Sequence, residues 1–328
     1  VTGAGGTIGL ELCRQVLKYG PAKLVALENH ATSLFYCEGE LRRLARGVAL
    51  STVLGDVRDE ALVERVFRLH APQVVLHAAA HKHVHQLETN VHEGITNNVL
   101  GTWNVARAAD RQGAEVFLLI STDKAVKPRS VMGATKRVAE LIVRALGRAG
   151  RTRFIGVRFG NVLGSSGSVL GIFQQQIADG GPVTVTDERA TRYFMTVEES
   201  VGLILQAVSM AKGGEIFVLK MGTPVRIMDM ARNLILLSGL EPGKDIEIKV
   251  TGLKQGEKLD EELAEDPSEM SASGHPDITV LKPDPGDAAI TPVLVAELEA
   301  LSRSADPGPV VRKLQGLIPT FHPDPAHN

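Results

Sequence analysis

Two kinds of hydrophobic spacing alternate along the first half of the chain. Apolar residues recur every three or four positions around 10–17, 34–44, 62–69 and 99–109, and short apolar runs lie between them at 24–27, 53–54, 74–76, 116–120 and 154–157. The first spacing is typical of a helix with one buried face, and the second of a strand buried on both faces. Their alternation predicts an α/β fold with a doubly wound parallel sheet and helices on both of its faces.

The second half of the chain predicts a smaller unit beside that sheet. Glycine, proline and charged residues become denser from residue 160, and the strand–helix alternation returns at 197–210 and 216–219. We therefore expect residues 1–160 to form the sheet domain, to which the chain returns at about 197–222. Residues 161–328 are expected to form mainly a C-terminal α/β cap, with helices near 228–237 and 292–301. The tail, 319–328, is rich in proline and histidine, so we expect it to be flexible.

Composition argues against several classes of function. The 328 residues are 44% hydrophobic, so the chain can bury a large core. The net charge of −2 and the 4% of aromatic residues argue against a nucleic-acid partner. No apolar run approaches the roughly 20 residues of a membrane helix, and we expect no signal peptide. Cys13 and Cys37 fall in helical patterns, which indicates free thiols in a reducing, cytoplasmic compartment.

A glycine-rich turn opens the chain between residues 2 and 9, and helical spacing follows it directly. Glycine permits a sharp turn and the close approach of backbone to a pyrophosphate, and the following helix directs its free N–H groups at the phosphates. We expect this turn to bind a dinucleotide through Gly3, Gly6, Thr7, Ile8 and Gly9. Because the strand that should precede the turn is almost wholly missing, we expect that Val1 is not the natural start of the protein.

An acidic residue after the next predicted strand indicates which dinucleotide is bound. Glu28 stands 19 residues after Gly9, close to the roughly 20 expected for the acid that binds the adenosine ribose. Its carboxylate would repel a 2′-phosphate, which favours NAD over NADP. We expect further cofactor contacts at the ends of the following strands, from Asp56, Val57, Ala78, Ala79 and Ala80. These features predict a dinucleotide-binding, Rossmann-like domain; a glycine turn that binds no cofactor is the alternative.

Residues 121–136 carry the candidate chemistry. The apolar run 116–120 leads into Thr122, Asp123 and Lys124, and Lys136 lies one turn into the helical pattern that follows. In open α/β sheets ligands bind at the carboxyl ends of the strands, which is where this hydroxyl, carboxylate and ammonium stand. A solvated Asp123–Lys124 ion pair is the alternative interpretation.

Nine motifs, in order along the chain, together resemble one family of enzymes. They are residues 2–9 (TGAGGTIG), 55–59 (GDVRD), 77–84 (HAAAHKHV), 97–102 (NNVLGT), 121–125 (STDKA), 132–136 (MGATK), 158–168 (RFGNVLGSSGS), 191–196 (TRYFMT) and 252–258 (GLKQGEK). The chain resembles the extended short-chain dehydrogenase/reductases and, among them, the polysaccharide-biosynthesis UDP-N-acetylglucosamine 4,6-dehydratases. Met132 stands where the superfamily usually has a tyrosine. In this the chain resembles the soluble catalytic part of the membrane-anchored branch, where membrane helices precede that part.

The resemblance implies NAD-dependent 4,6-dehydration of a UDP-N-acetylhexosamine to a 4-keto-6-deoxy sugar for bacterial surface glycans. The substrate that it implies first is UDP-N-acetylglucosamine. Oxidation at carbon 4 acidifies the proton on carbon 5, water is lost across carbons 5 and 6, and reduction at carbon 6 completes the cycle. We expect Asp123 to be the general acid, with a raised pKa, and Lys124 the base at carbon 5, with a pKa lowered by burial and by Lys136. Thr122 is expected at the carbon 4 oxygen and Lys136 at the nicotinamide ribose. Either a water or Asp123 acting through Thr122 takes the carbon 4 hydroxyl proton.

The resemblance also implies further binding residues. Asn98 is expected at the cofactor; Lys82, Met132, Asn161, Ser168, Arg192 and Glu257 are expected at the substrate. Asn161 and Ser168 would meet the diphosphate, and Arg192 offers a planar fork for phosphate, although a structural salt bridge is the alternative for it. A homo-oligomer is implied, with membrane attachment only through a segment before Val1.

Three other interpretations are weighed. Histidines at 81, 83 and 85 alternate, and with His77 they raise the question of a metal site. The family motif accounts for His77 and His83 and no Cys/Asp cluster joins them, so we predict no metal. A nucleotide-sugar 4-epimerase would share the fold, but it needs no acid–base pair at carbons 5 and 6. A catalytically silent NAD-binding regulator is supported by Met132 alone.

Overall fold

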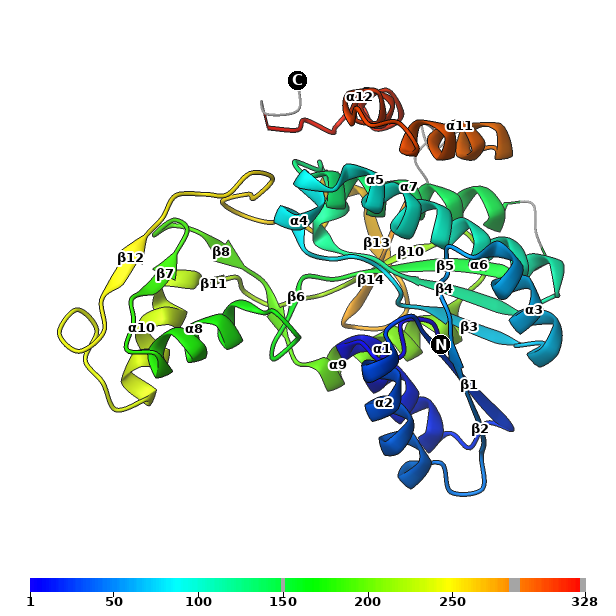
Figure 1. The fold of residues 1–328 in the computed structure, drawn as a ribbon, viewed down its shortest axis with the longest axis horizontal. Helices are drawn as coiled ribbons and strands as arrows, with labels where there is room; N and C mark the ends of the chain where they lie inside the picture. Colours follow the sequence, from blue (N-terminus) through cyan, green and yellow to red (C-terminus); the bar gives the residue numbers. More distant parts are fainter. Residues whose placement is uncertain (149–150, 283–289, 325–328) are drawn as a thin grey trace.

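The protein is built from a large twisted sheet with helices on both faces and a smaller cap at one side (Figure 1). The structure, a computed structural model, describes residues 1–148, 151–282 and 290–324. The chain enters the cap after the sheet strand that ends at Arg158, and it returns to the sheet domain through the helix that begins at Val197. The α/β class and the parallel, doubly wound sheet predicted from the spacing of apolar residues are confirmed.

The sheet has its parallel strands in the order expected for a dinucleotide-binding fold. They are β1 (Lys23–Glu28), β2 (Ala49–Leu54), β3 (Val74–His77), β4 (Val116–Ile120), β5 (Arg153–Arg158) and β10 (Ile216–Leu219). β1 pairs with β2, and β3, β4, β5 and β10 pair in sequence, all parallel. Thr2 bridges the two groups through Leu27 and His77. The carboxyl ends of these strands therefore share one edge of the sheet.

Helices cover both faces of the sheet (Figure 1). One face carries α1 (Thr7–Lys18), α2 (Ala31–Leu44) and α9 (Val197–Met210). The other carries α3 (Glu60–His70), the π-helix η1 (Gly94–Leu100), α6 (Gly101–Arg111) and α7 (Val131–Gly147). Each face has its own apolar core, formed by Leu12, Val201 and Ile204 on the first side and by Phe117, Val138 and Ile142 on the second. Helix α7 is buried along most of its length, which fixes the strand–helix connection that precedes it.

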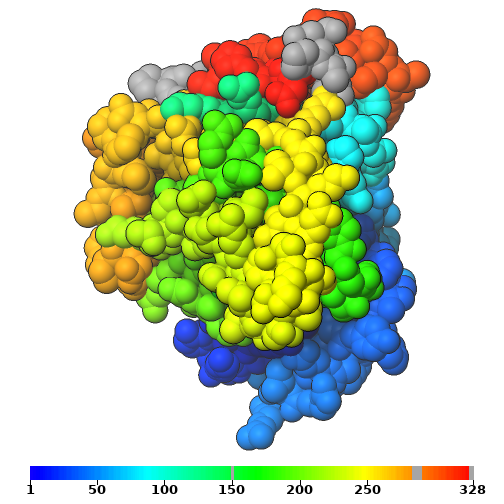
Figure 2. Space-filling model, turned by 90° about the vertical axis from the view of Figure 1, so that its left-hand side faces the viewer, coloured from blue at the N-terminus to red at the C-terminus, as the bar shows by residue number. Residues whose placement is uncertain are grey.

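The cap is a separate α/β layer with its own core. Short strands pair within it, β7 (Val183–Val185) with β12 (Ile248–Val250) and β8 (Thr191–Arg192) with β11 (Val225–Arg226). Helices α8 (Val169–Ala178) and α10 (Ile227–Leu237) pack on them around Phe173 and Ile235. β6 (Asn161–Val162) and β9 (Phe194–Met195) pair where cap and sheet meet. In Figure 2 the yellow segment of the cap lies in front of its green segments and beside the sheet domain.

The C-terminal part of the chain corrects our placement of residues beyond 222. β14 (Ile278–Leu281) and β13 (Met270–Ala272) extend the large sheet antiparallel to β10. α11 (Pro292–Ser302) and α12 (Gly308–Leu317) lie over η1, α5 (Val91–Glu93) and α7, away from the cap (Figure 1). Their apolar residues, Leu294, Leu298 and Leu314, join the core of the sheet domain. Helical spacing showed that a helix exists at 292–301, but it carried no information on which surface would bury that helix.

The tail expected to be flexible is held in place as far as the structure describes it. Phe321 is 1% exposed and belongs to the core of the sheet domain. His322 donates its backbone N–H to the Pro128 oxygen at 3.1 Å, and Asp324 accepts the Gly256 N–H at 2.7 Å. The prediction of a flexible tail is therefore wrong for residues 319–324, since one large apolar side chain anchors them; residues 325–328 lie outside the described residues.

Shorter elements complete the chain: α4 (Val84–Thr89), α5 (Val91–Glu93) and the 3₁₀ turns η2 (Asp123–Ala125) and η3 (Pro267–Glu269). None of the helices in the described ranges combines the length and the apolar character needed to cross a bilayer.

Candidate active site

A cavity of about 740 Å³ lies along the carboxyl edge of the sheet, between the glycine turn and the cap. Its size is that of a ligand cleft. The residues predicted for function that line it are Gly3, Gly6, Thr7, Ile8, Gly9, Ala78, Ala80, Lys82, Thr122, Lys124, Met132, Lys136, Asn161 and Ser168. The fold thus brings the glycine turn, the end of β4 and the start of α7 to one space, as strand-end chemistry requires.

The glycine turn is shaped by contacts that leave no room for side chains. Gly3 has a φ of +66°, and a Cβ there would lie 2.7 Å from the Ala79 nitrogen. A Cβ on Gly9 would lie 1.9 Å from the Gly3 oxygen. Gly6 is the N-cap of α1 and has no side chain to satisfy the free N–H groups of the first helical turn. The N-terminal end of α1 therefore faces the cavity with N–H groups available to an anion.

The acidic residues expected near the adenosine hold the backbone in this structure. Glu28 is 9% exposed, and its carboxylate accepts the N–H groups of Gly5 at 2.9 Å, Asn29 at 3.0 Å and His30 at 3.1 Å. Asp56 is paired with Arg58 at 2.8 Å. These contacts place Glu28 directly behind the glycine turn, at the end of β1, but outside the lining of the cavity.

Three other expected cofactor residues support the site from behind. Val57 is buried against Gly101, where a Cβ would lie 2.7 Å from the valine methyl group. Asn98 accepts the His81 N–H at 2.8 Å and donates to the His81 oxygen at 3.0 Å, which fixes the backbone beside Ala80. Ala79 packs on Gly3. Asn98 and Ala79 thus support the loop after β3 from behind the cavity, whereas Val57 packs on the start of α6.

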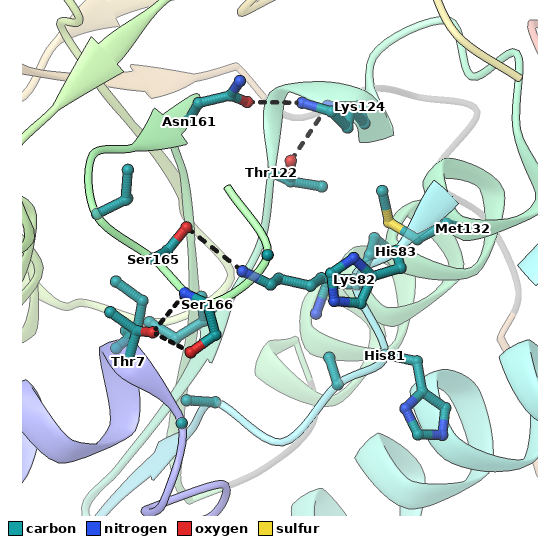
Figure 3. Close-up of a pocket in the computed structure, with 18 of the residues that line it drawn as sticks. Thr7, His81, Lys82, His83, Thr122, Lys124, Met132, Asn161, Ser165 and Ser166 are labelled. Carbon is teal, nitrogen blue, oxygen red and sulfur yellow. Dashed lines mark hydrogen bonds between the residues drawn. The ribbon is translucent and has the colours of Figure 1, made fainter. Parts of the chain in front are cut away.

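Thr122, Asp123 and Lys124 form a hydrogen-bonded series at the end of β4. Figure 3 shows Thr122 beside Lys124. Asp123 has no exposed surface, and its Oδ1 accepts the Thr122 hydroxyl at 2.8 Å and the Lys124 Nζ at 3.0 Å. Lys124 Nζ also donates to Asn161 Oδ1 at 3.0 Å. A hydroxyl, a carboxylate and an amine therefore stand within proton-transfer distance of one another beside the cavity.

Glu261 completes this cluster and was missed by our sequence analysis. Its Oε1 lies 3.5 Å from Lys124 Nζ and 4.0 Å from Arg192 Nε. It follows the 252–258 motif as the first of two adjacent glutamates. Leu259 and Leu263 flank it at alternating positions, and both pack in apolar cores. That alternation was the available signal, because in an extended segment it places Glu261 on the inward side with the leucines.

The charges of this cluster correct the expected pKa of Lys124. Burial lowers the pKa of its ammonium, but the carboxylates of Asp123 and Glu261 outweigh burial and raise it above its usual 10.5. Burial does raise the pKa of Glu261. Burial lowers the pKa of Lys136 to about 8, because only the charge of Glu140 opposes it there. Lys124 is thus held as an ammonium, and a neutral amine requires a change at its partners.

Lys136 and Met132 lie one turn apart on α7, and both line the cavity. Glu140, one turn further, is fully buried; it accepts the Ser121 hydroxyl at 2.6 Å and pairs with Arg158 at 2.6 Å. This buried pair ties α7 to β5 and to the residue that precedes Thr122. The positions of the acid–base residues therefore depend on a network inside the sheet domain.

The loop after β6 crosses the cavity toward the glycine turn (Figure 3). Ser166 donates its N–H to Thr7 Oγ1 at 3.2 Å, and Lys82 Nζ reaches Ser165 Oγ at 3.4 Å. Gly167 faces the His83 ring, where a Cβ would lie 2.7 Å from the nearest ring atom. This loop brings Ser168 to the cavity lining.

Arg192 and Glu257 lie outside the cavity lining. Arg192 donates to three backbone oxygens, Thr191 at 2.6 Å, Leu259 at 2.9 Å and Lys258 at 2.8 Å, and its side chain is 11% exposed. In this structure its planar fork holds the segment before Glu261, and its expected contact with a phosphate stays a prediction. Glu257 accepts the Lys254 N–H at 3.3 Å.

The histidines considered for a metal site have separate environments. The His77 ring lies between Thr2 at 2.8 Å and Thr102 at 3.0 Å, and burial lowers the pKa of His77 to about 3. His81 lies 3.8 Å from Glu93. Across the described ranges, no three His, Cys, Asp or Glu side chains gather in a way that could hold a metal ion.

This fold and this site together define an extended short-chain dehydrogenase/reductase. The glycine turn, the strand-end Thr-Asp-Lys series and the lysine one turn into the next helix all lie along one cavity, as that class requires. The chain belongs to the polysaccharide biosynthesis protein family, whose profile matches residues 1–283.

Relatives within this family carry names connected with surface glycans. A Bacillus subtilis protein named probable polysaccharide biosynthesis protein EpsC is 48% identical over 91% of this chain and 50% of its own length. The chain thus spans about half of that relative. A Campylobacter jejuni UDP-N-acetylglucosamine 4,6-dehydratase (inverting) is 34% identical over 80% of this chain and 75% of its own. A Rickettsia rickettsii UDP-glucose 4-epimerase is 32% identical over 80% and 76%.

Solved structures share the architecture. Pen from Bacillus thuringiensis superposes with a TM-score of 0.79 at 32% identity, covering 86% of both chains. A dTDP-glucose 4,6-dehydratase from Streptomyces venezuelae, crystallised with NAD, has the same fold, with a TM-score of 0.70 at 22% identity over 80% of this chain and 87% of its own.

Proposed function

We propose that the protein catalyses NAD-dependent 4,6-dehydration of a UDP-N-acetylhexosamine to the 4-keto-6-deoxy sugar. The substrate that we expect is UDP-N-acetylglucosamine. The observation that carries this proposal is the hydrogen-bonded series Thr122–Asp123–Lys124 at the carboxyl end of β4. Loss of water across two carbons needs one acid and one base side by side. The 34% identical Campylobacter jejuni dehydratase supports the choice of substrate. Self-association and membrane attachment through a segment before Val1 stay predictions.

The residues present fit a dinucleotide. The uncapped first turn of α1 faces the cavity beside Gly6, and N–H groups in that arrangement bind a pyrophosphate. Ala78 and Ala80 line the next part of the cavity. Lys136 lines the same cavity, and we expect it to hold the nicotinamide ribose. When bound, NAD supplies the nicotinamide that accepts a hydride from carbon 4 and gives it back at carbon 6.

The protein's own residues provide a route for the carbon 4 hydroxyl proton. Thr122 Oγ1 already donates to Asp123 at 2.8 Å. A sugar hydroxyl bonded to Thr122 can therefore pass its proton to the threonine oxygen while the threonine proton moves to Asp123. Asp123 is then protonated and can give that proton to the hydroxyl that leaves carbon 6. This relay needs no tyrosine at position 132.

Lys124 is proposed as the base at carbon 5. It lines the cavity, and Asn161 and Asp123 fix its amine at 3.0 Å each. The ketone formed at carbon 4 acidifies the carbon 5 proton, which the amine removes and later returns. Asn161 contributes orientation, because its amide oxygen is one of the acceptors that hold the Lys124 side chain in the cavity.

A 4-epimerase is the second candidate, since the Rickettsia rickettsii relative bears that name. An epimerase needs proton transfer at carbon 4 alone, so the Asp123–Lys124 pair would have no task. A catalytically silent regulator would likewise leave this buried, aligned pair without a role. Both alternatives predict that UDP-N-acetylglucosamine keeps its oxygen at carbon 6.

Product analysis distinguishes these possibilities. The protein is incubated with NAD and UDP-N-acetylglucosamine, and the sugar is identified by mass spectrometry and NMR. We expect loss of water and a 4-keto-6-deoxy sugar. Asp123→Asn and Lys124→Ala should each lower the rate on the order of 10²–10⁴-fold, whereas Lys249→Ala, on the exposed strand β12, should not. A 4-epimer, or near-normal dehydration by both cluster variants, contradicts the proposal.

A further inference from the structure

Glu261 faces Lys124 from the segment that follows the 252–258 motif, and the proposed function has given it no role. Its side chain is 3% exposed, and Oε1 lies 3.5 Å from Lys124 Nζ. Among the described residues, Oε2 has no hydrogen-bond partner although it is buried. A buried carboxylate oxygen without a donor is costly, so a carboxyl in this position is close to accepting a proton.

Lys124 Nζ donates hydrogen bonds to Asp123 Oδ1 and Asn161 Oδ1, each 3.0 Å away, and forms an ion pair with Glu261 Oε1 at 3.5 Å. A base at carbon 5 needs a lone pair on this nitrogen. One proton must therefore leave Lys124 before the reaction.

The two carboxyls that could receive this proton are not equivalent. Asp123 accepts the Thr122 hydroxyl, and this bond stabilises its anion and reserves it for the carbon 4 relay. Oδ2 of Asp123 and Oε2 of Glu261 are both buried without a donor, but Asp123 Oδ1 also accepts the Lys124 ammonium at 3.0 Å. The nearest cations to Glu261 Oε1 are Lys124 Nζ at 3.5 Å and Arg192 Nε at 4.0 Å. Burial, with the charge of Asp123, raises the pKa of Glu261 against the opposing charges of Lys124, Arg192 and Lys258. Glu261 is thus the carboxyl that gains more from protonation.

We propose that Glu261 is a positioning residue that sets the protonation state of Lys124 by storing one of its protons while the nucleotide sugar occupies the cavity. An N–H bond of the Lys124 ammonium breaks and an O–H bond forms on Glu261, so that the ion pair becomes an amine and a carboxylic acid. The amine takes the proton from carbon 5 and returns it there when carbon 6 is reduced. After product release Glu261 returns its proton to Lys124. This inference rests on the proposed function.

Glu261→Gln tests the role, because glutamine keeps the shape of the side chain and cannot store the proton. We expect kcat at pH 7 to fall on the order of 10²-fold, with little change in KM. The rate of the variant should then climb by about tenfold per pH unit toward alkaline pH, since solvent removes the Lys124 proton instead, while the wild-type profile stays flat. Loss of the negative charge should also lower the pKa of Lys124, followed by NMR on protein with isotope-labelled lysine.

Glu262→Gln is the matched control. Glu262 is the adjacent residue, its side chain is 47% exposed, and it pairs with Lys127 at 3.4 Å on the surface; its substitution should change neither rate nor pH profile. Full activity of Glu261→Gln at pH 7, or a rate lowered equally at every pH, overturns the inference. Should Glu261→Gln unfold, Glu261→Asp keeps a carboxyl and is expected to show a flat profile; a steep one contradicts the proposal.

The NMR titration separates this inference from the proposed function. It is recorded on NAD-loaded protein without sugar, so it does not depend on turnover. If wild type fails to dehydrate UDP-N-acetylglucosamine but Glu261→Gln lowers the pKa of Lys124, the assigned reaction is wrong and the coupling between Glu261 and Lys124 stands. An unchanged pKa of Lys124 overturns the inference whatever the activity.

Discussion

Glu140→Gln should destabilise the protein strongly, because Glu140 is the centre of the buried network behind the active site. Its carboxylate has no exposed surface and accepts Arg158 Nη2 at 2.6 Å, Arg158 Nε at 3.0 Å and the Ser121 hydroxyl at 2.6 Å. Neutral glutamine leaves the Arg158 charge buried without its counter-charge, which costs about 3–5 kcal/mol. Since Ser121 precedes Thr122, the rate of sugar conversion should fall as well.

The pH dependence of this effect follows from the pKa of Glu140. Burial would raise it, but the charge and hydrogen bonds of Arg158, with help from Arg137 and Ser121, lower it to about 2 from its ordinary 4.5. Because the pKa is lower in the folded protein, the stabilisation is complete above pH 4.5 and is lost as the pH falls toward 2. The difference in pKa corresponds to roughly 3 kcal/mol.

Urea unfolding of wild type and Glu140→Gln at pH 7 and at pH 3 measures both quantities. We expect a large difference in the free energy of unfolding at pH 7 and a smaller one at pH 3. Glu60→Gln is the control, since Glu60 is 63% exposed and its substitution should change stability by less than about 0.5 kcal/mol. A loss below about 1 kcal/mol at pH 7, or an equal loss at both pH values, would refute the assignment of Glu140.

Three further predictions concern the glycine turn, the tail and the relay. Gly9→Ala places a Cβ 1.9 Å from a carbonyl oxygen of the turn, so it should weaken NAD binding, measured by calorimetry, at least about tenfold. Gly39→Ala, with open space around the new Cβ, should raise the melting temperature slightly. Phe321→Ala should cost about 3–5 kcal/mol in urea unfolding, and Leu237→Ala, 85% exposed, almost nothing. Thr122→Val should lower kcat on the order of 10²-fold while Thr122→Ser stays active; equal rates would exclude the relay.

The sheet domain could be predicted from the sequence because its signals are local. A buried parallel strand reads as a short apolar run, and each run here lies at or within one of the observed strands β1 to β5 and β10. The glycine turn and residues 122–124 carry their meaning in consecutive positions. Topology then brings them together, because parallel strands end at the same edge.

The surfaces on which distant segments pack could not be predicted in this way. Residues 292–301 show helical spacing, but their burial against the sheet domain depends on an apolar surface contributed by η1 and α5. Phe321 is a single apolar residue among prolines and histidines, and one side chain produces no periodicity. Such contacts depend on shape, and they become visible only in the folded chain.

The electrostatics of the site failed to follow from sequence for a related reason. Lys124 was expected to lose its charge by burial, but the carboxylates of Asp123 and of Glu261 together outweigh burial and raise its pKa. Glu261 lies 137 positions later in the chain and 3.5 Å from the amine. Arg192 was expected at a phosphate, and the sequence did not reveal that it also holds the backbone at Lys258 and Leu259. Local motifs identify which groups are present, and tertiary contacts determine their charge and direction.

Isotope transfer in a single turnover tests the central claim most directly. UDP-N-acetylglucosamine carrying deuterium at carbon 4 is mixed with NAD-loaded protein, and the product is analysed by NMR. If the protein removes a hydride at carbon 4 and returns it to the same sugar after water loss, the deuterium will be found at carbon 6 of a 4-keto-6-deoxy product. Deuterium that remains at carbon 4, in unchanged substrate or in a 4-epimer, would contradict the account.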